Sequence, residues 1–164
     1  PASGSRQCPF LPRERPLMMR YLLDTNIISE PARPDPSETV VRRLADHSGV
    51  TALPSVAWHE LVYGVRRMEE GRRRSHLRDY LMEVVRPSQP IVPYDADAAQ
   101  WHGRARAVLE AEGRPPPFAD GQIAAIAATR ALILVTQNTS DFVPFEDLGT
   151  EIGKRLHVEN WFAA

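Results

Sequence analysis

Short apolar runs of strand length alternate along the chain with longer segments that have the spacing of amphipathic helices. The apolar runs cover residues 19–24, 49–53, 90–95 and 131–136, with a further candidate edge strand over 155–162. Consecutive parallel strands need a connection of a dozen or more residues, which usually contains a helix. The alternation therefore predicts a three-layer α/β domain, in which helices cover both faces of a mostly parallel central sheet of four to five strands.

The segments between these runs carry common helix start and stop signals. We expect helices over residues 35–47, 54–71, 72–85, 96–112 and 119–130. The predicted N-caps are Asp35, Ser55 and Asp95. Gly71 and Gly113 are predicted stops, because glycine commonly follows the last helical turn.

The composition is that of an ordinary folded chain. It has 164 residues, 43% of them hydrophobic and 25% charged, with a formal net charge of -1. Residues 1–18 are rich in proline and arginine and show no periodic pattern, so we interpret them as a flexible leader or an artificial extension ahead of a start at Met18 or Met19. A single domain is then expected over residues 19–164.

The sequence indicates a cytoplasmic protein without a membrane anchor. No apolar segment approaches the ~20 residues that a membrane-spanning helix requires, and residues 1–19 lack the apolar core of a secretory signal. Cys8 is the only cysteine, which excludes an intrachain disulfide and a multi-cysteine metal site.

Acidic side chains follow two of the predicted strands. Asp24 closes the first apolar run, and Asp141 follows the run 131–136 within a few residues. In open α/β sheets, ligands bind outside the carboxyl ends of the strands, so both residues are candidates for a site. A plainer alternative exists for each of them: Asp24 as a helix cap or turn residue, and Asp141 as an ordinary loop residue.

Two more acids fall on predicted helices. Glu60 shares its stripe with Val56, Ala57 and Gly64, apart from the charged face of the same helix. A charge among small and apolar side chains needs a partner, which is either a ligand or an internal salt bridge to an arginine. Asp120 stands at the start of a helix rich in small residues, where N-capping is the plainer alternative.

Taken together, these acids predict a divalent cation site. Several convergent carboxylates without a Cys or His cluster are the ligands that Mg²⁺ or Mn²⁺ prefers. Packed carboxylates repel one another, and a cation removes that repulsion. Mg²⁺ is typically shared between a few protein carboxylates and substrate phosphates, which indicates phosphodiester or phosphoryl chemistry.

Four segments resemble, in their order and spacing, the motif set of PIN-domain ribonucleases, in particular the VapC and FitB-like toxins of type II toxin–antitoxin modules. They are LLDTNIISE, WHELVYG, FADGQIAAIAATR and LILVTQNTSDF. The resemblance covers residues 19 to about 163 and implies a PIN-like fold. It assigns catalytic and metal-binding roles to Asp24, Glu60, Asp120 and Asp141, and supporting polar roles to Thr25, Asn26, Thr136 and Asn138. Gln137 departs from the pattern, because relatives often carry arginine there.

The resemblance implies an Mg²⁺- or Mn²⁺-dependent endoribonuclease, a hydrolase that acts as the toxin of a toxin–antitoxin pair. The implied partners are an RNA substrate, a cognate VapB-like antitoxin and a second copy of the chain in a homodimer. One alternative is a PIN-like module that binds RNA or a partner without cutting. Another is a metal-dependent phosphatase, but that class needs a second Asp two residues after the first, where this chain has Asn26.

Overall fold

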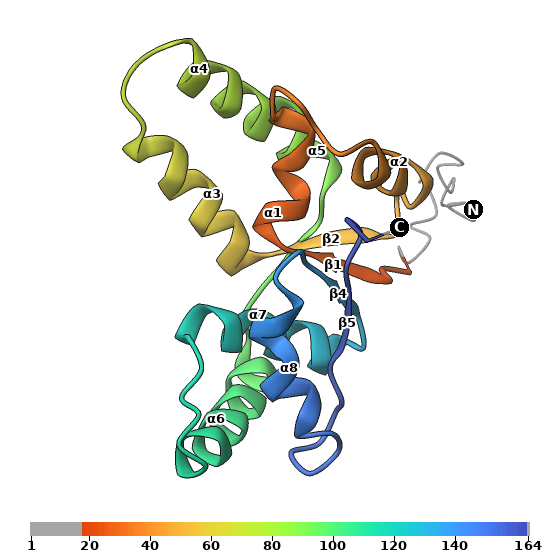
Figure 1. Ribbon diagram of the computed structural model, residues 1–164, viewed down its shortest axis with the longest axis vertical. Coiled ribbons are helices and arrows are strands. Elements are labelled where there is room, and N and C mark those ends of the chain that lie inside the picture. The colour runs from red at the N-terminus through yellow and green to blue at the C-terminus, as the bar shows by residue number, and fades with distance from the viewer. Residues whose placement is uncertain (1–17, 164) are drawn as a thin grey trace, which may run out of the picture.

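The computed structural model describes residues 18–163, so the predicted leader up to residue 17, with Cys8, lies outside the described residues. Its centre is a five-stranded sheet in the order β3-β2-β1-β4-β5 (Figure 1). The strands are β1 (Tyr21–Leu23), β2 (Thr51–Pro54), β3 (Ile91–Val92), β4 (Ile133–Val135) and β5 (His157–Glu159). All four pairings are parallel, and β5 lies at the edge. The predicted parallel sheet and the edge strand are confirmed.

The two faces of the sheet are covered by two groups of helices, which makes the three layers. One group contains α6 (Ala96–Ala111), α7 (Phe118–Arg130) and α8 (Thr139–Asp147). The other contains α1 (Thr25–Ile28), α2 (Glu38–Asp46), α3 (Ser55–Arg67), α4 (Arg72–Asp79) and α5 (Arg86–Ser88), with short 3-10 and π-helical segments at Glu30–Ala32 and Tyr80–Val85. None of the described helices is both long and apolar enough to cross a membrane.

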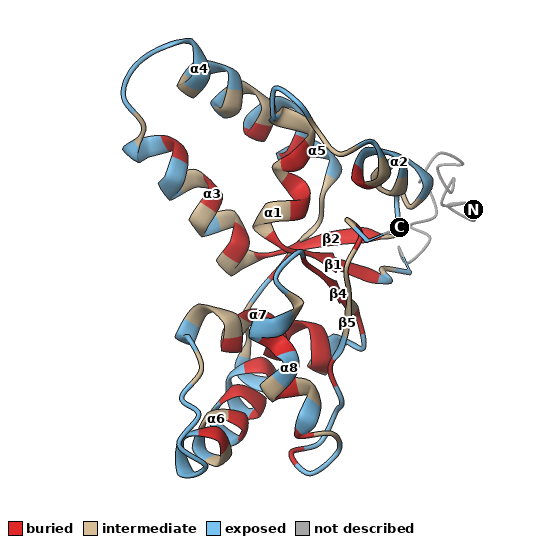
Figure 2. Cartoon of the chain, viewed as in Figure 1, coloured by how far each residue is buried: buried red, intermediate tan, exposed pale blue. Residues whose placement is uncertain are grey.

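The core divides at the central strand. Leu22 faces a buried cluster that it shares with α6, α7 and α8, whereas its neighbour Leu23 faces a second cluster on the side of α1 and α3. This division follows from the alternation of side chains along a strand. The strands β1 and β2 are buried on both faces, as Figure 2 shows, which is why they read as continuous apolar runs in the sequence, whereas the edge strand β5 is exposed or half-buried.

Several helix ends differ from the sequence prediction. The N-cap of α2 is Ser37 and not Asp35, because the buried Glu30 accepts a hydrogen bond from the Ser37 backbone N–H at 2.8 Å and holds the chain outside the helix up to that point. Ser55 is the first residue of α3 rather than its cap. Gly71 precedes α4 and does not end α3, which stops at Arg67.

The caps of α6 agree with the prediction, whereas three helices were not predicted, one of them the three-residue α5. Asp95 accepts a hydrogen bond from the Ala98 backbone N–H at 3.1 Å, and Gly113 takes a positive φ of 72° just after the helix. The other two are α1, which has only four residues, and α8, which contains Pro144. These two helices position Asp24 and Asp141, respectively.

Candidate acidic site

Asp24 lies where β1 ends and α1 begins. Its Oδ1 accepts a hydrogen bond from the Thr25 backbone N–H at 2.7 Å, so the plainer prediction of a helix cap is confirmed. The Asp24 backbone N–H donates to the carbonyl of Val135 at 2.9 Å, which ties this position to the end of β4. With 7% of the residue exposed, Asp24 is a largely buried acid at the carboxyl end of the sheet.

The second oxygen of Asp24 is held by side chains from two strand ends. Oδ2 accepts hydrogen bonds from Thr136 Oγ1 at 2.7 Å and from Asn26 Nδ2 at 3.2 Å. Asn26 Oδ1 in turn accepts from the Gln137 backbone N–H at 3.0 Å, and Thr136 Oγ1 accepts from the Asn138 backbone N–H at 3.1 Å. The network therefore fixes the orientation of the Asp24 carboxylate, and Asn138 contributes to it through its backbone.

Glu60 projects from the second turn of α3 and is half-buried. Burial raises the pKa of its carboxyl group most strongly, the charges of Asp24 and Asp120 raise it further, and His59 has the opposite effect. Within residues 18–163, Glu60 forms no ion pair, so the salt-bridge alternative finds no support. The charges that raise the pKa of Glu60 are thus those of other carboxylates.

Asp120 and Asp141 each lie in the first turn of a helix. Asp120 is the third residue of α7, and the cap position belongs to Pro117, so the N-cap alternative for Asp120 is wrong. Burial, followed by the charges of Asp141 and Asp24, raises the pKa of Asp120 to about 6. A helix N-terminus normally favours the ionised form of an acid, and here burial and neighbouring charge outweigh that effect. Asp141 is exposed on α8.

The fold thus brings together the four predicted acids from the end of β1 and from α3, α7 and α8. The charges of Asp24 and Asp120 raise the pKa of Glu60, and the charges of Asp141 and Asp24 raise the pKa of Asp120. Their oxygens, with the hydroxyl of Thr136, form a donor set suited to a hard divalent cation. Among the described residues, no group of three or more His, Cys, Asp or Glu side chains is placed so that it could hold a metal ion as it stands. The acids suit a cation by the chemistry of their oxygens and by their mutual repulsion.

A buried contact beside Asp120 was not predicted from the sequence. His102, on α6, is 2% exposed, and its Nδ1 lies 3.0 Å from the Tyr94 hydroxyl group. Its Nε2 has no hydrogen-bond partner among the described residues and faces Gly121, where an added Cβ would lie 2.2 Å away. The sequence signal for this approach is a glycine inside a helix, directly after a candidate site residue.

Known proteins that resemble this chain carry the same fold. A sequence model of the PIN domain family matches residues 21–146. Toxin FitB of Neisseria gonorrhoeae is 34% identical over 124 residues, which are 74% of this chain and 89% of the relative. The tRNA(fMet)-specific endonuclease VapC of Shigella flexneri is 33% identical over 134 residues, 82% of this chain and 98% of the relative. The crystal structure of FitAcB from Neisseria gonorrhoeae has a TM-score of 0.74 at 30% identity, covering 88% of this chain and 99% of that one.

Proposed function

The chain belongs to the PIN domain family, and from that membership we propose that it is the ribonuclease toxin of a toxin–antitoxin pair. In this proposal it is an Mg²⁺- or Mn²⁺-dependent endoribonuclease that hydrolyses RNA phosphodiester bonds at Asp24, Glu60, Asp120 and Asp141. The supporting observation is the convergence of these acids from four separate elements, where burial and mutual charge raise the pKa of two of them. Relatives whose names include an endonuclease and a toxin support the same activity.

Asp24, Glu60 and Asp120 would hold the cation, and Asp141, which is the most exposed of the four acids, would act on it through water. When bound, such a cation neutralises charge on the scissile phosphate and the leaving oxygen and makes a water molecule more acidic. The chain itself supplies the orientation of Asp24, because Thr136 and Asn26 hold one oxygen and the Thr25 backbone N–H holds the other. A fixed carboxylate needs no reorganisation when the substrate arrives.

Protonation of Asp120 sets a condition on this site. Without a cation, its pKa of about 6 leaves a large fraction of the side chain neutral in mildly acidic solution. A carboxyl group must ionise before it can bind a metal, so cation binding below that pH displaces a proton. The proposed activity therefore favours neutral or alkaline solution.

The proposal includes an antitoxin partner and a homodimer. One relative is named as a toxin, and a similar solved structure at 26% identity is a VapBC complex from Salmonella typhimurium; both support an antitoxin of the VapB type, which would bind this chain and block cleavage. The acids carry negative charge when metal-free, so an arginine-bearing segment of the partner suits them electrostatically. Co-purification with the product of a neighbouring reading frame, followed by mass determination of the complex, tests both associations.

The activity is tested by incubating purified, antitoxin-free protein with total cellular RNA and Mn²⁺ or Mg²⁺, beside a sample with EDTA. Asp24→Asn keeps an oxygen that can cap α1 and removes the charge, while Asp97→Asn removes an exposed acid in the first turn of α6. We expect cleavage by the wild type and by Asp97→Asn, and none by Asp24→Asn or in EDTA. RNA that is bound but never cut would favour a non-catalytic binding module instead.

A further inference from the structure

Two large aromatic side chains are exposed on the helices that carry Glu60 and Asp120. Tyr63 is 54% exposed and follows Glu60 by three residues on α3, whereas Phe118 is 56% exposed and precedes Asp120 by two residues on α7. The other large hydrophobic side chains that the structure describes as exposed are aliphatic. Both exposed aromatic side chains therefore lie on the two helices that bear Glu60 and Asp120. Exposed apolar side chains that gather in one area often mark an interaction site.

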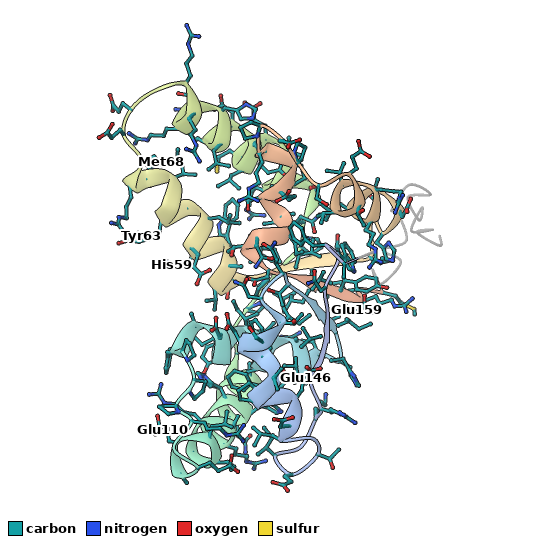
Figure 3. The ribbon with its side chains drawn as sticks, viewed as in Figure 1. His59, Tyr63, Met68, Glu110, Glu146 and Glu159 are labelled. Carbon is teal, nitrogen blue, oxygen red and sulfur yellow. The ribbon has the colours of Figure 1, made fainter. Side chains whose placement is uncertain are left out.

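Tyr63 is the middle member of a column on α3. His59, Tyr63 and Arg67 are four residues apart, so they lie on one face of the helix. The rings of His59 and Tyr63 are nearly parallel, at 7°, with centroids 6.0 Å apart, and Arg67 Cζ lies 5.4 Å from the Tyr63 centroid. Figure 3 shows His59 and Tyr63 along the same side of α3. The column begins next to Glu60 and leads away from the acids.

Phe118 has a comparable setting at the start of α7. Its ring packs on the buried His102, with centroids 4.9 Å apart, and the Cζ of Arg106 lies 5.1 Å from the Phe118 centroid. Arg106 is also paired with Glu110, which holds the guanidinium in place. The phenylalanine ring is therefore supported from within the protein although more than half of it is exposed to solvent.

An aromatic ring with an arginine beside it suits one nucleotide of single-stranded RNA. An unpaired base stacks on the ring, and the guanidinium attracts the phosphate that follows. Arg67 and Arg106 place positive charge beside the two rings, where it can attract the phosphates of an RNA that the acids alone would repel. Paired bases in a duplex are already stacked on one another, so these side chains select unpaired nucleotides.

We infer that Tyr63 and Phe118 are base-stacking positions for single-stranded RNA, one on each of the helices that carry Glu60 and Asp120. Arg67 and Arg106 neutralise the adjoining phosphates. Bases held at both positions place the intervening backbone at the acids. The inference rests on the proposed function, because it concerns how the same site receives its RNA.

The test is fluorescence anisotropy with a fluorescein-labelled single-stranded oligoribonucleotide and Mg²⁺, with all variants in the Asp24→Asn background so that the RNA stays intact. Tyr63→Ala and Phe118→Ala should each weaken binding about tenfold, because each removes a ring on which a base stacks. Tyr63→Trp, which keeps an aromatic ring at this position, should bind the RNA about as tightly as the parent does. Val84→Ala, which removes an aliphatic side chain that is 52% exposed in the Tyr80–Val85 segment, is the matched control and should bind as the parent does.

Three results would overturn the inference. The first is that the alanine variants bind the single strand as tightly as the parent does. The second is that they lose affinity for a duplex of the same sequence to the same extent. The third is that Tyr63→Ala converts a dimer to a monomer in sedimentation while RNA affinity stays unchanged, which would make the aromatic surface an interface between copies of the chain.

Cleavage assays separate this inference from the proposed function. In the chain with Asp24 intact, Tyr63→Ala should raise KM and leave kcat near the wild-type value, because the stacking position lies outside the acids. If the wild type cuts RNA and the alanine variants match it in KM, only the stacking inference fails. If the wild type with bound cation cuts nothing, the proposed function fails as well.

Discussion

Replacing Gly121 with alanine should destabilise the protein and disturb Asp120, because the new methyl group would collide with His102. A Cβ at position 121 would lie 2.2 Å from Nε2, 2.7 Å from Cδ2 and 3.0 Å from Cε1 of that ring. The shortest of these distances is about 1.2 Å below the 3.4 Å at which ordinary contact begins. Either α6 and α7 must separate or the imidazole must move.

The imidazole has little freedom to move. Its Nδ1 lies 3.0 Å from the Tyr94 hydroxyl, and its ring packs against Phe118 inside the protein. Overpacking of this kind costs about 1–3 kcal/mol, and a clash with a fixed ring belongs at the upper end. Alanine recovers about 1 kcal/mol in helix propensity. The net loss is about 2 kcal/mol, which lowers the Tm of a chain of this length by roughly 4–8 °C.

Thermal unfolding followed by circular dichroism measures this loss, and Gly103→Ala is the matched control. Gly103 lies on α6 with no atom within 4 Å of its added Cβ, so alanine there should stabilise the protein by up to about 1 kcal/mol. His102→Ala in the Gly121→Ala background should remove the clash and give a double variant more stable than the sum of the two single effects. Mn²⁺ binding by folded Gly121→Ala should be weaker than by the wild type. A Gly121→Ala protein as stable as Gly103→Ala would refute the reasoning.

Three further predictions concern the acids and their supports. The pKa of Asp120 is raised from 3.8 to about 6 in the fold, so its stabilising contribution is present below about pH 4 and is lost as pH rises through 6. The Tm of EDTA-treated protein should therefore fall less between about pH 5 and pH 7.5 in Asp120→Asn than in the wild type, and identical profiles would contradict this. Thr136→Val removes the donor to Asp24 and should cost about 1–3 kcal/mol in chemical denaturation, whereas Thr136→Ser should cost less; equal losses would point to packing instead. Millimolar Mn²⁺ should raise the Tm of the wild type but not that of Asp24→Asn, and an unchanged wild-type Tm would argue against the site.

The sheet and the acids were predictable because their signals are local. Buried parallel strands read as apolar runs, and Asp24 stands at the point where such a run ends. Glu60 could be singled out because its helical stripe is otherwise small or apolar; in the structure Ala57 of that stripe is buried and Val56 half-buried, while Gly64 is exposed. In both cases the residue's own neighbours in sequence determine where it lies.

Other features depend on tertiary contacts that no local pattern reports. The helix α8 forms around Pro144 because Phe142 and Phe145 bury themselves in the core, which outweighs the lost backbone hydrogen bond. The start of α2 depends on the buried Glu30, which lies seven residues before the cap. The contact between His102 and Gly121 depends on the distance between two helices. Such contacts can be predicted only when the packing of the helices against one another is known.

The central claim is that four carboxylates from four elements act on one cation site during RNA cleavage. It is tested most directly by measuring cleavage rate against Mn²⁺ concentration for Asp24→Asn, Glu60→Gln, Asp120→Asn and Asp141→Asn, with Asp97→Asn as control. The account predicts that the first three variants abolish cleavage or require far more Mn²⁺, that Asp141→Asn has a smaller effect, and that Asp97→Asn matches the wild type. Folded variants of Asp24, Glu60 and Asp120 that cut RNA with the wild-type Mn²⁺ dependence would contradict it.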